Sequence, residues 1–326
     1  MNSFSNKLRE NQALTERIDY SKVFLETIKT TALECLTSEW DNVAVFAAGS
    51  LGRFEAGRQS DLDVFVLAKQ RQTMPGGPNP LNHLDEIRLF SKLIEINSKL
   101  NLPEFSGDGR YLKAHGVERI ISSTGDAHDD IENLFTTRML LLLESQAIWN
   151  SELRADAIKS VLANYFKDGK GKTDFRPLFL LNDILRYWRT LCLNYERDRV
   201  ISKKWWKTNL NLKFSRKLTI FSTVLLIVTQ EAQTIDDFIR ITDLVPLERL
   251  ALALDKLGDD SLLDRFDLFL NDYESFLAAK SFNEVMNQTA EKKTEFKSKA
   301  ESFGTLIYDA IMSDKIDPRF RRFAII

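Results

Sequence analysis

The chain has 326 residues, of which 44% are hydrophobic and 28% charged, so it can bury one large core or two smaller ones. Lys and Arg number 45 against 47 Asp and Glu, and this net charge of −2 argues against a protein that coats DNA or a membrane surface through bulk positive charge. Two cysteines are too few for a disulfide framework or a zinc cluster, so we expect a cytoplasmic protein. We also expect no secretory signal and no membrane span, because the apolar run 218–229 is too short to cross a bilayer.

In chain order, residues 5–38 have helical spacing of apolar side chains. Residues 42–50 and 62–68 are short β-branched runs that predict two buried strands, joined by a charged, turn-rich connection that begins with a helical turn. The Pro- and Gly-rich stretch 74–82 predicts a surface loop, and residues 84–100 predict an amphipathic helix.

The rest of the chain favours helices. Residues 103–115 return to a strand-like pattern, and beyond Asp129 one helical pattern follows another. Nine of the thirteen glycines lie before residue 126, which fits a turn-rich first part and a helical second part. We therefore predict an α+β fold, with a mixed-sheet domain over residues 1–128 and an α-helical bundle over residues 129–326.

The most informative stretch is AAGSLGRFEAGRQSDLDVFV, residues 47–66. Here one strand ends in Gly49-Ser50, and Asp61-Leu62-Asp63 opens the next. Alternation along a strand places Asp61 and Asp63 on one face, with α-carbons about 7 Å apart, where their carboxylates could share divalent cations. Glycine allows a close backbone approach and the serine offers a hydroxyl, both suited to gripping phosphate oxygens.

This compound motif resembles the DNA polymerase β-like nucleotidyltransferase superfamily. Within it, GSLGRFEAGRQSDLDVFVL is most similar to the bacterial branch that contains glutamine synthetase adenylyltransferase and PII uridylyltransferase, over about 80 residues. The resemblance implies that Gly49 and Ser50 bind the triphosphate and that Arg53 and Ser60 also contact the nucleotide. Pairing with Glu55 or another nearby acid is the competing interpretation of Arg53. The resemblance also implies that Asp61 and Asp63 hold two Mg²⁺ ions, or Mn²⁺, during catalysis.

Members of the superfamily carry a third catalytic carboxylate on a later strand, which also binds metal. The resemblance leaves two candidates in PEFSGDGRYL: Glu104, which we favour, and Asp108 in a Gly-Asp-Gly turn. Turn or capping duty explains either residue equally well.

A basic segment follows in the helical part. Residues 186–217 hold ten basic and two acidic side chains, interleaved with aromatic ones. Helical spacing places Asn182 and Arg186 on one face, and Lys213 and Arg216 lie near the end of the segment; we predict that all four contact nucleotide phosphate. An ordinary polar helix face and aromatic packing are the competing interpretations.

Together these features predict a Mg²⁺-dependent enzyme that transfers a nucleoside monophosphate from an NTP, ATP first, to a hydroxyl. A protein is the first candidate acceptor and an RNA the second. The alternatives are a non-catalytic nucleotide-binding regulatory module and a tRNA-modifying toxin component on the same fold.

Overall fold

A computed structural model describes residues 2–69, 81–105, 108–109, 112–169, 172, 175–199, 205–229, 233–281 and 289–325. The chain divides into two compact units. The sheet unit comprises Arg17–Lys167, and the helical unit comprises Met1–Glu16 together with Asp168–Ile326.

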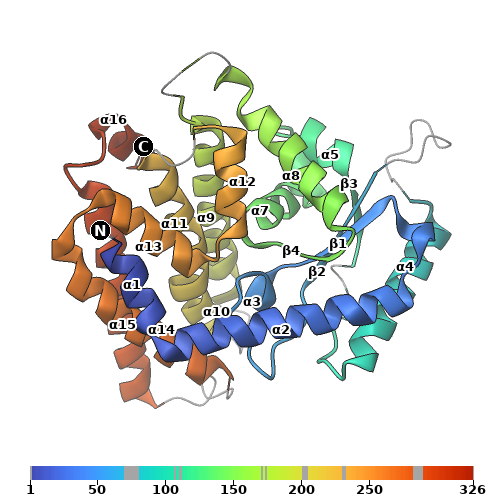
Figure 1. Cartoon of the computed structure of the whole chain (residues 1–326), viewed down its shortest axis with the longest axis horizontal. Coiled ribbons are helices and arrows are strands. Elements are labelled where there is room, and N and C mark those ends of the chain that lie inside the picture. The colour runs from blue at the N-terminus through green and yellow to red at the C-terminus, as the bar shows by residue number, and fades with distance from the viewer. Residues whose placement is uncertain are drawn as a thin grey trace. The chain divides into compact units, whose positions relative to one another are not determined.

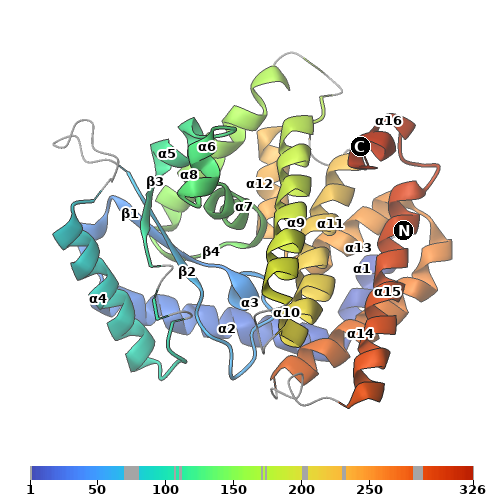
Figure 2. The same cartoon turned by 180° about the vertical axis from the view of Figure 1, so that it is seen from behind.

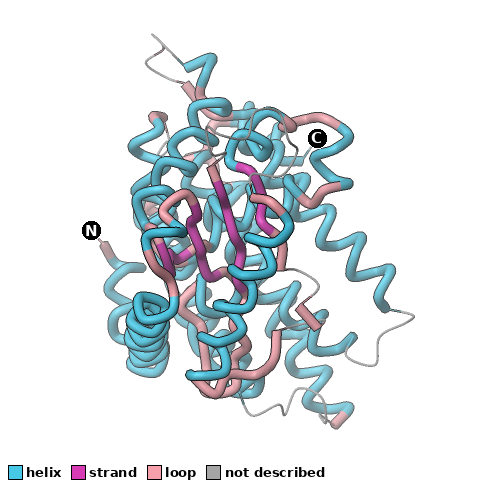
Figure 3. Tube along the Cα trace, turned by 90° about the vertical axis from the view of Figure 1, so that its right-hand side faces the viewer, coloured by secondary structure: helices cyan, strands magenta, loops and turns pink. Residues whose placement is uncertain are grey.

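The sheet unit contains a four-stranded mixed sheet in the order β3-β2-β1-β4. Figure 3 shows the strands in magenta. Its strands are β1 (Val43–Ala47), β2 (Val64–Ala68), β3 (Ala114–Gly116) and β4 (Gln146–Trp149). β1 pairs antiparallel with both β2 and β4, whereas β2 and β3 are parallel. The α+β prediction is confirmed at this level.

Helices cover both faces of this sheet (Figure 2). Alternate strand residues such as Val45 and Val66 share a buried core with α2 (Gln12–Cys35) and α4 (His83–Lys99). On the other face Phe46 stacks on Phe65 at 5.7 Å between ring centroids. The remaining helical segments of the unit are η1 (Ser38–Trp40), α3 (Gly49–Gly52), α5 (Val117–Ser122), α6 (Ala127–Ile131), α7 (Leu134–Glu144) and α8 (Ser151–Tyr165).

The helical unit is built from α1 (Ser3–Glu10) and the helices that follow residue 168 (Figure 1). Its core is aromatic: Phe214 stacks on Phe276 with centroids 4.7 Å apart, and Phe269 stacks on Phe303 at 4.1 Å. The helical segments are η2 (Lys167–Gly169, at the boundary), α9 (Leu178–Arg199), α10 (Trp205–Asn211), the π-helix η3 (Leu212–Arg216), α11 (Lys217–Val228), α12 (Ile235–Asp243), α13 (Pro246–Leu257), η4 (Asp260–Leu262), α14 (Leu263–Ser281), α15 (Ala290–Met312) and α16 (Pro318–Ile325).

Local sequence explains several helix ends. Asn82 caps α4 by accepting a hydrogen bond from the Asp85 amide at 2.8 Å. α13 begins at Pro246 and stops before Gly258, which adopts a left-handed φ of 59°. These residue choices fix helix boundaries where the apolar pattern alone leaves them open.

The units divide elsewhere than the sequence suggested. The expected boundary after residue 128 moves to Lys167/Asp168, because β4 pairs with β1 and α8 packs on the same strand. The chain start also belongs to the helical unit. There Asp255 accepts hydrogen bonds from the backbone amides of Phe4 and Ser5 at 2.9 and 3.1 Å, which satisfies donors at the start of α1.

The two early strands and the 84–100 helix are present, and their ends lie within three residues of those expected. β4 was missed, since residues 131–149 read as one helix. Of the expected 74–82 loop, residues 74–80 lie outside the described residues. Among the described residues, no helix is both long and apolar enough to span a membrane.

Candidate functional site

The two parts of the sequence motif meet at one end of the β1–β2 pair. Ala47 lies opposite Val64, and the pairing continues one step further, where the Ala48 amide donates to the Asp63 carbonyl oxygen at 2.9 Å. α3 then starts at Gly49, directly after β1. The antiparallel register therefore brings Gly49 and Ser50 beside the segment that leads into β2.

Gly49 and Asp63 are in direct contact. Gly49 adopts a φ of +64°, a conformation that L side chains rarely take. A Cβ at this position would overlap Oδ2 of Asp63 and stand 3.1 Å from its Cγ. Glycine is required here for both reasons, and the Asp63 carboxylate lies against the Gly49 backbone.

The segment before β2 alternates in burial. β2 starts at Val64, so Asp61 and Asp63 precede the strand instead of opening it. Leu62 and Val64 are nevertheless buried, whereas Ser60, Asp61 and Asp63 are half-buried. Asp61 and Asp63 thus share the side of the segment that faces away from the core, as extended backbone requires.

Arg53 is engaged inside the protein. Its Nε donates to Glu55 at 3.0 Å and its Nη1 donates to Glu144 at 2.7 Å, and all three residues are at most 4% exposed. Arg53 was expected to contact nucleotide. The structure instead gives its guanidinium to two buried carboxylates, which tie the connection after α3 to the end of α7.

Gly52 reinforces this tie. A Cβ at Gly52 would overlap the carbonyl oxygen of Glu144 and stand 3.0 Å from the carbonyl carbon. The backbones of α3 and the end of α7 are therefore in direct contact. This contact holds α3, and with it Gly49 and Ser50, in place.

The third-carboxylate candidates lie outside regular structure. Glu104 and Asp108 are both exposed, and β3 begins only at Ala114. Asp108 has a left-handed φ of 58°, and Gly109 follows with 69°. Within the described ranges, no group of three His, Cys, Asp or Glu side chains is arranged to hold a metal ion.

The segment that carries Asp108 nevertheless lies beside Asp63. A cavity of about 60 Å³ is lined by residues 62–65 on one side and by Phe105, Gly109 and Leu112 on the other. β3 pairs with β2 in a parallel register that aligns Ala114 with Val66. The pairing begins at Ala114, after the turn that contains Asp108, and the cavity is lined by a neighbour of each candidate: Phe105 follows Glu104 and Gly109 follows Asp108.

The predicted phosphate contacts of the helical unit occupy two places. Asn182 is exposed on α9, where the half-buried Arg186 has its Nη1 3.8 Å from Oδ1 of the buried Asp183. Lys213 and Arg216 belong to η3, and Lys213 lines a pocket. Trp205 stacks on Tyr195 at 5.6 Å, so this aromatic side chain serves packing.

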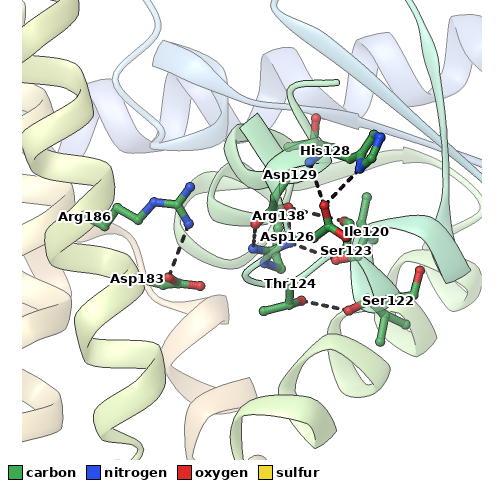
Figure 4. Close-up of polar contacts among 12 residues, drawn as sticks. Ile120, Ser122, Ser123, Thr124, Asp126, His128, Asp129, Arg138, Asp183 and Arg186 are labelled. Carbon is green, nitrogen blue, oxygen red and sulfur yellow. Dashed lines mark hydrogen bonds and ion pairs between the residues drawn. The ribbon is translucent and has the colours of Figure 1, made fainter. Parts of the chain in front are cut away.

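Sequence reasoning missed a buried ion pair in the sheet unit (Figure 4). Arg138 on α7 is fully buried and donates to both carboxylate oxygens of Asp129, at 2.9 and 2.5 Å. It also donates to the Ile120 carbonyl and to the Tyr165 hydroxyl, at 2.8 and 2.9 Å. Within RMLLLL the lone arginine was the available signal, since a buried guanidinium needs a buried carboxylate.

β3 contributes a buried imidazole. Burial lowers the pKa of His115 to about 4, and repulsion from Lys113 adds to the effect. His115 is therefore neutral at physiological pH, which is consistent with a structural histidine.

Comparisons of the sequence with profiles of known protein families and with curated proteins find no match.

Proposed function

We propose that the protein is a Mg²⁺-dependent nucleotidyltransferase of the DNA polymerase β-like type, which transfers a nucleoside monophosphate from an NTP, ATP first, to a hydroxyl acceptor. The observation that carries the proposal is the contact between the Gly49 backbone and the Asp63 carboxylate, with Ser50 and Asp61 beside them. This contact joins the phosphate-gripping and metal-binding halves of the sequence motif in one place.

Asp61 and Asp63 fit a divalent cation. Both are half-buried carboxylates on one side of a segment that leads into a buried strand, and Mg²⁺ prefers oxygen ligands and retains positions for phosphate. The bound ions would neutralise the triphosphate and lower the pKa of the acceptor hydroxyl. Glu104 is our candidate for the third carboxylate, with Asp108 as the alternative.

The chain's own residues position the reactants. The Ser50 hydroxyl donates a hydrogen bond to a phosphate oxygen, and Gly49 lets the nucleotide approach the backbone closely. The acceptor oxygen bonds to the α-phosphorus while the bond from that phosphorus to the leaving oxygen breaks, so pyrophosphate departs. A carboxylate beside the aspartate pair takes the proton of the acceptor.

Further parts of the proposal concern partners and location. A protein is the first acceptor, by resemblance to protein-modifying enzymes, and an RNA is the second, because of the basic 186–217 segment. The contributions of Asn182, Arg186, Lys213 and Arg216 to nucleotide binding remain predictions. The free cysteines Cys35 and Cys192 support a cytoplasmic location.

A transfer assay tests the proposal. Purified protein is incubated with each α-³²P-labelled NTP, Mg²⁺ or Mn²⁺, and cell lysate. The Asp61→Asn/Asp63→Asn double variant is compared with wild type. A control, Asp19→Asn/Asp156→Asn, changes the charge of the sheet unit equally at side chains that are 76% and 66% exposed.

Label in a protein or RNA band with wild type and the control, but not with Asp61→Asn/Asp63→Asn, supports the transferase and identifies the acceptor class. Label that persists in that double variant contradicts it. One observation favours a second candidate, a non-catalytic nucleotide-binding module: among the described residues, no third carboxylate converges with Asp61 and Asp63. Metal-dependent NTP binding without transfer would support that module.

A further inference from the structure

A separate pocket lies within the helical unit. It has a volume of about 460 Å³ and is lined by Lys213 and Lys217 on one side. The facing side is one stripe of α15, formed by Ala300, Glu301, Gly304, Thr305 and Tyr308. This volume is within the range of pockets that hold small organic ligands.

The π-helix places the two lysines. Residues 205–228 form one continuous helical run, which widens into a π-helical turn at Leu212–Arg216 before α11 begins. π-helical turns inside α-helices occur mostly at functional sites. Lys213 lies in this turn and Lys217 follows four residues later, so both amines reach the same pocket.

The Lys217 ammonium is poorly satisfied. Its hydrogen bond to the Ala300 carbonyl oxygen is 3.5 Å long, at the limit for such a bond, although an ammonium can donate three. Burial and the charge of Lys213 lower the pKa of Lys217 to about 8, although Cys192 on α9 and Glu301 on α15 act in the opposite direction. The ammonium also lies 5.7 Å from the centroid of the Phe303 ring, a cation–π contact. The pocket lining holds two lysines and one carboxylate, that of Glu301, and this excess of positive charge favours an incoming anion.

The α15 side of the pocket also leaves room for a ligand beside the two lysines. A Cβ at position 304 would stand 3.2 Å from Lys217 Nζ, so Gly304 leaves this amine its place. The Thr305 hydroxyl donates to the Glu301 carbonyl oxygen at 3.2 Å, and Tyr308 presents an exposed aromatic side chain on which the body of a ligand can pack. The carboxylate of Glu301 can accept hydrogen bonds from ligand hydroxyls.

We infer that Lys213 and Lys217 form a binding site for a small phosphate monoester. Lysine binds phosphate as a point charge, and two lysines match the two negative charges of a monoester at neutral pH. The inference goes beyond the proposed nucleotidyl transfer, because this site lies within the helical unit and needs no divalent metal.

The test uses pyridoxal 5′-phosphate, which carries a phosphate monoester and an amine-reactive aldehyde. While Lys213 holds the phosphate of the probe, the neutral amine of Lys217 attacks the aldehyde carbon, a C=N bond forms and water leaves. Borohydride then reduces the C=N bond, and mass spectrometry of peptides locates the label. Pyridoxal, which lacks the phosphate, is the matched probe, and inorganic phosphate is the competitor.

We expect Lys217 to be labelled at least tenfold faster than the exposed Lys292 of α15. We also expect pyridoxal to react at least tenfold more slowly at Lys217, and inorganic phosphate to protect it. Lys213→Met should slow Lys217 labelling by pyridoxal 5′-phosphate about tenfold, whereas Lys292→Met should leave it unchanged.

Equal labelling by both probes, or no protection by inorganic phosphate, would show a reactive lysine without a phosphate site and would overturn the inference. Labelling of Lys217 no faster than that of exposed lysines would overturn it as well. The test omits NTP and divalent metal, so its failure would leave the proposed transferase untouched.

Discussion

The buried Arg53–Glu55–Glu144 cluster gives the sharpest stability prediction. Replacing Arg53 with Met leaves two carboxylates, whose side chains are 3% and 1% exposed, without the guanidinium that now bonds them at 3.0 and 2.7 Å. Breaking a buried ion pair on one side typically costs about 3–5 kcal/mol, because the remaining charge stays desolvated. We therefore expect Arg53→Met to lower the free energy of unfolding of the sheet unit by that amount.

Companion variants separate charge from packing. The triple variant Arg53→Met/Glu55→Gln/Glu144→Gln also removes the two buried carboxylate charges and should recover about 2 kcal/mol relative to Arg53→Met, because a neutral cluster avoids the desolvation cost. The control Arg88→Met removes an arginine that is 71% exposed and paired with Asp85 at 3.4 Å. It should cost less than about 1 kcal/mol.

Urea unfolding followed by hydrogen exchange, read on peptides from residues 17–167, assigns the loss to the sheet unit. If Arg53→Met and Arg88→Met differ by less than about 1 kcal/mol, or if the triple variant is no more stable than the single one, the reasoning about buried charge is refuted.

Three further predictions follow from the geometry. Gly49→Ala forces alanine to a φ of +64° and into the Asp63 carboxylate, so metal-dependent nucleotide binding should fall at least tenfold. The control Gly125→Ala, with a φ of +84° and open space around its Cβ, should leave nucleotide binding intact. Equal losses of binding in the two variants would contradict the prediction. The pKa of His115 is about 4 in the folded chain, below its ordinary 6.5, so on acidification the unfolded chain binds the proton first, and going from pH 7 to 4 should cost about 3 kcal/mol of stability. Urea unfolding at several pH values should show that His115→Gln lacks this acid-induced loss. The same dependence of stability on pH in His115→Gln and wild type would refute the prediction. The pKa of Lys217 is about 8 in the folded chain and about 10.5 in the unfolded chain, so stability should rise by about 2.5 kcal/mol as the pH is raised from 7 to 10. This rise should be absent in Lys217→Met, and that variant should be more stable than wild type at pH 7.

The parts of the fold that were predicted correctly are those with a local cause. The runs 42–50 and 62–68 are apolar, β-branched and bounded by turn residues, and α4 has both an amphipathic pattern and an Asn82 cap. β4 escaped because QAIW follows α7 without a glycine or proline. Only its pairing with β1, about a hundred residues earlier in the chain, makes it a strand.

The residues of the candidate site show the same difference between local and long-range causes. Gly49, Ser50, Asp61 and Asp63 could be named from a contiguous motif, and the antiparallel β1–β2 register then brings them together. Of the two partners of Arg53, Glu55 lies two residues away and could be named from the sequence, whereas Glu144 lies 91 residues away and could not.

The lysine pocket was also beyond sequence reasoning. It depends on a π-helical turn and on the packing of α15 against it, neither of which leaves a local signal. Lys213 was singled out from charge alone, whereas Lys217 was counted only as part of the basic segment.

The central claim is that Gly49, Ser50, Asp61 and Asp63 together hold a metal–nucleotide complex, and it can be tested without knowing the acceptor. The measurement is calorimetric binding of an ATP analogue with a non-cleavable α–β bridge, with and without Mn²⁺, to wild type, Asp61→Asn/Asp63→Asn and the Asp19→Asn/Asp156→Asn control. We predict Mn²⁺-dependent binding to wild type and the control, weakened at least tenfold in Asp61→Asn/Asp63→Asn. Equal affinity in all three proteins, or no binding to wild type, would contradict the claim.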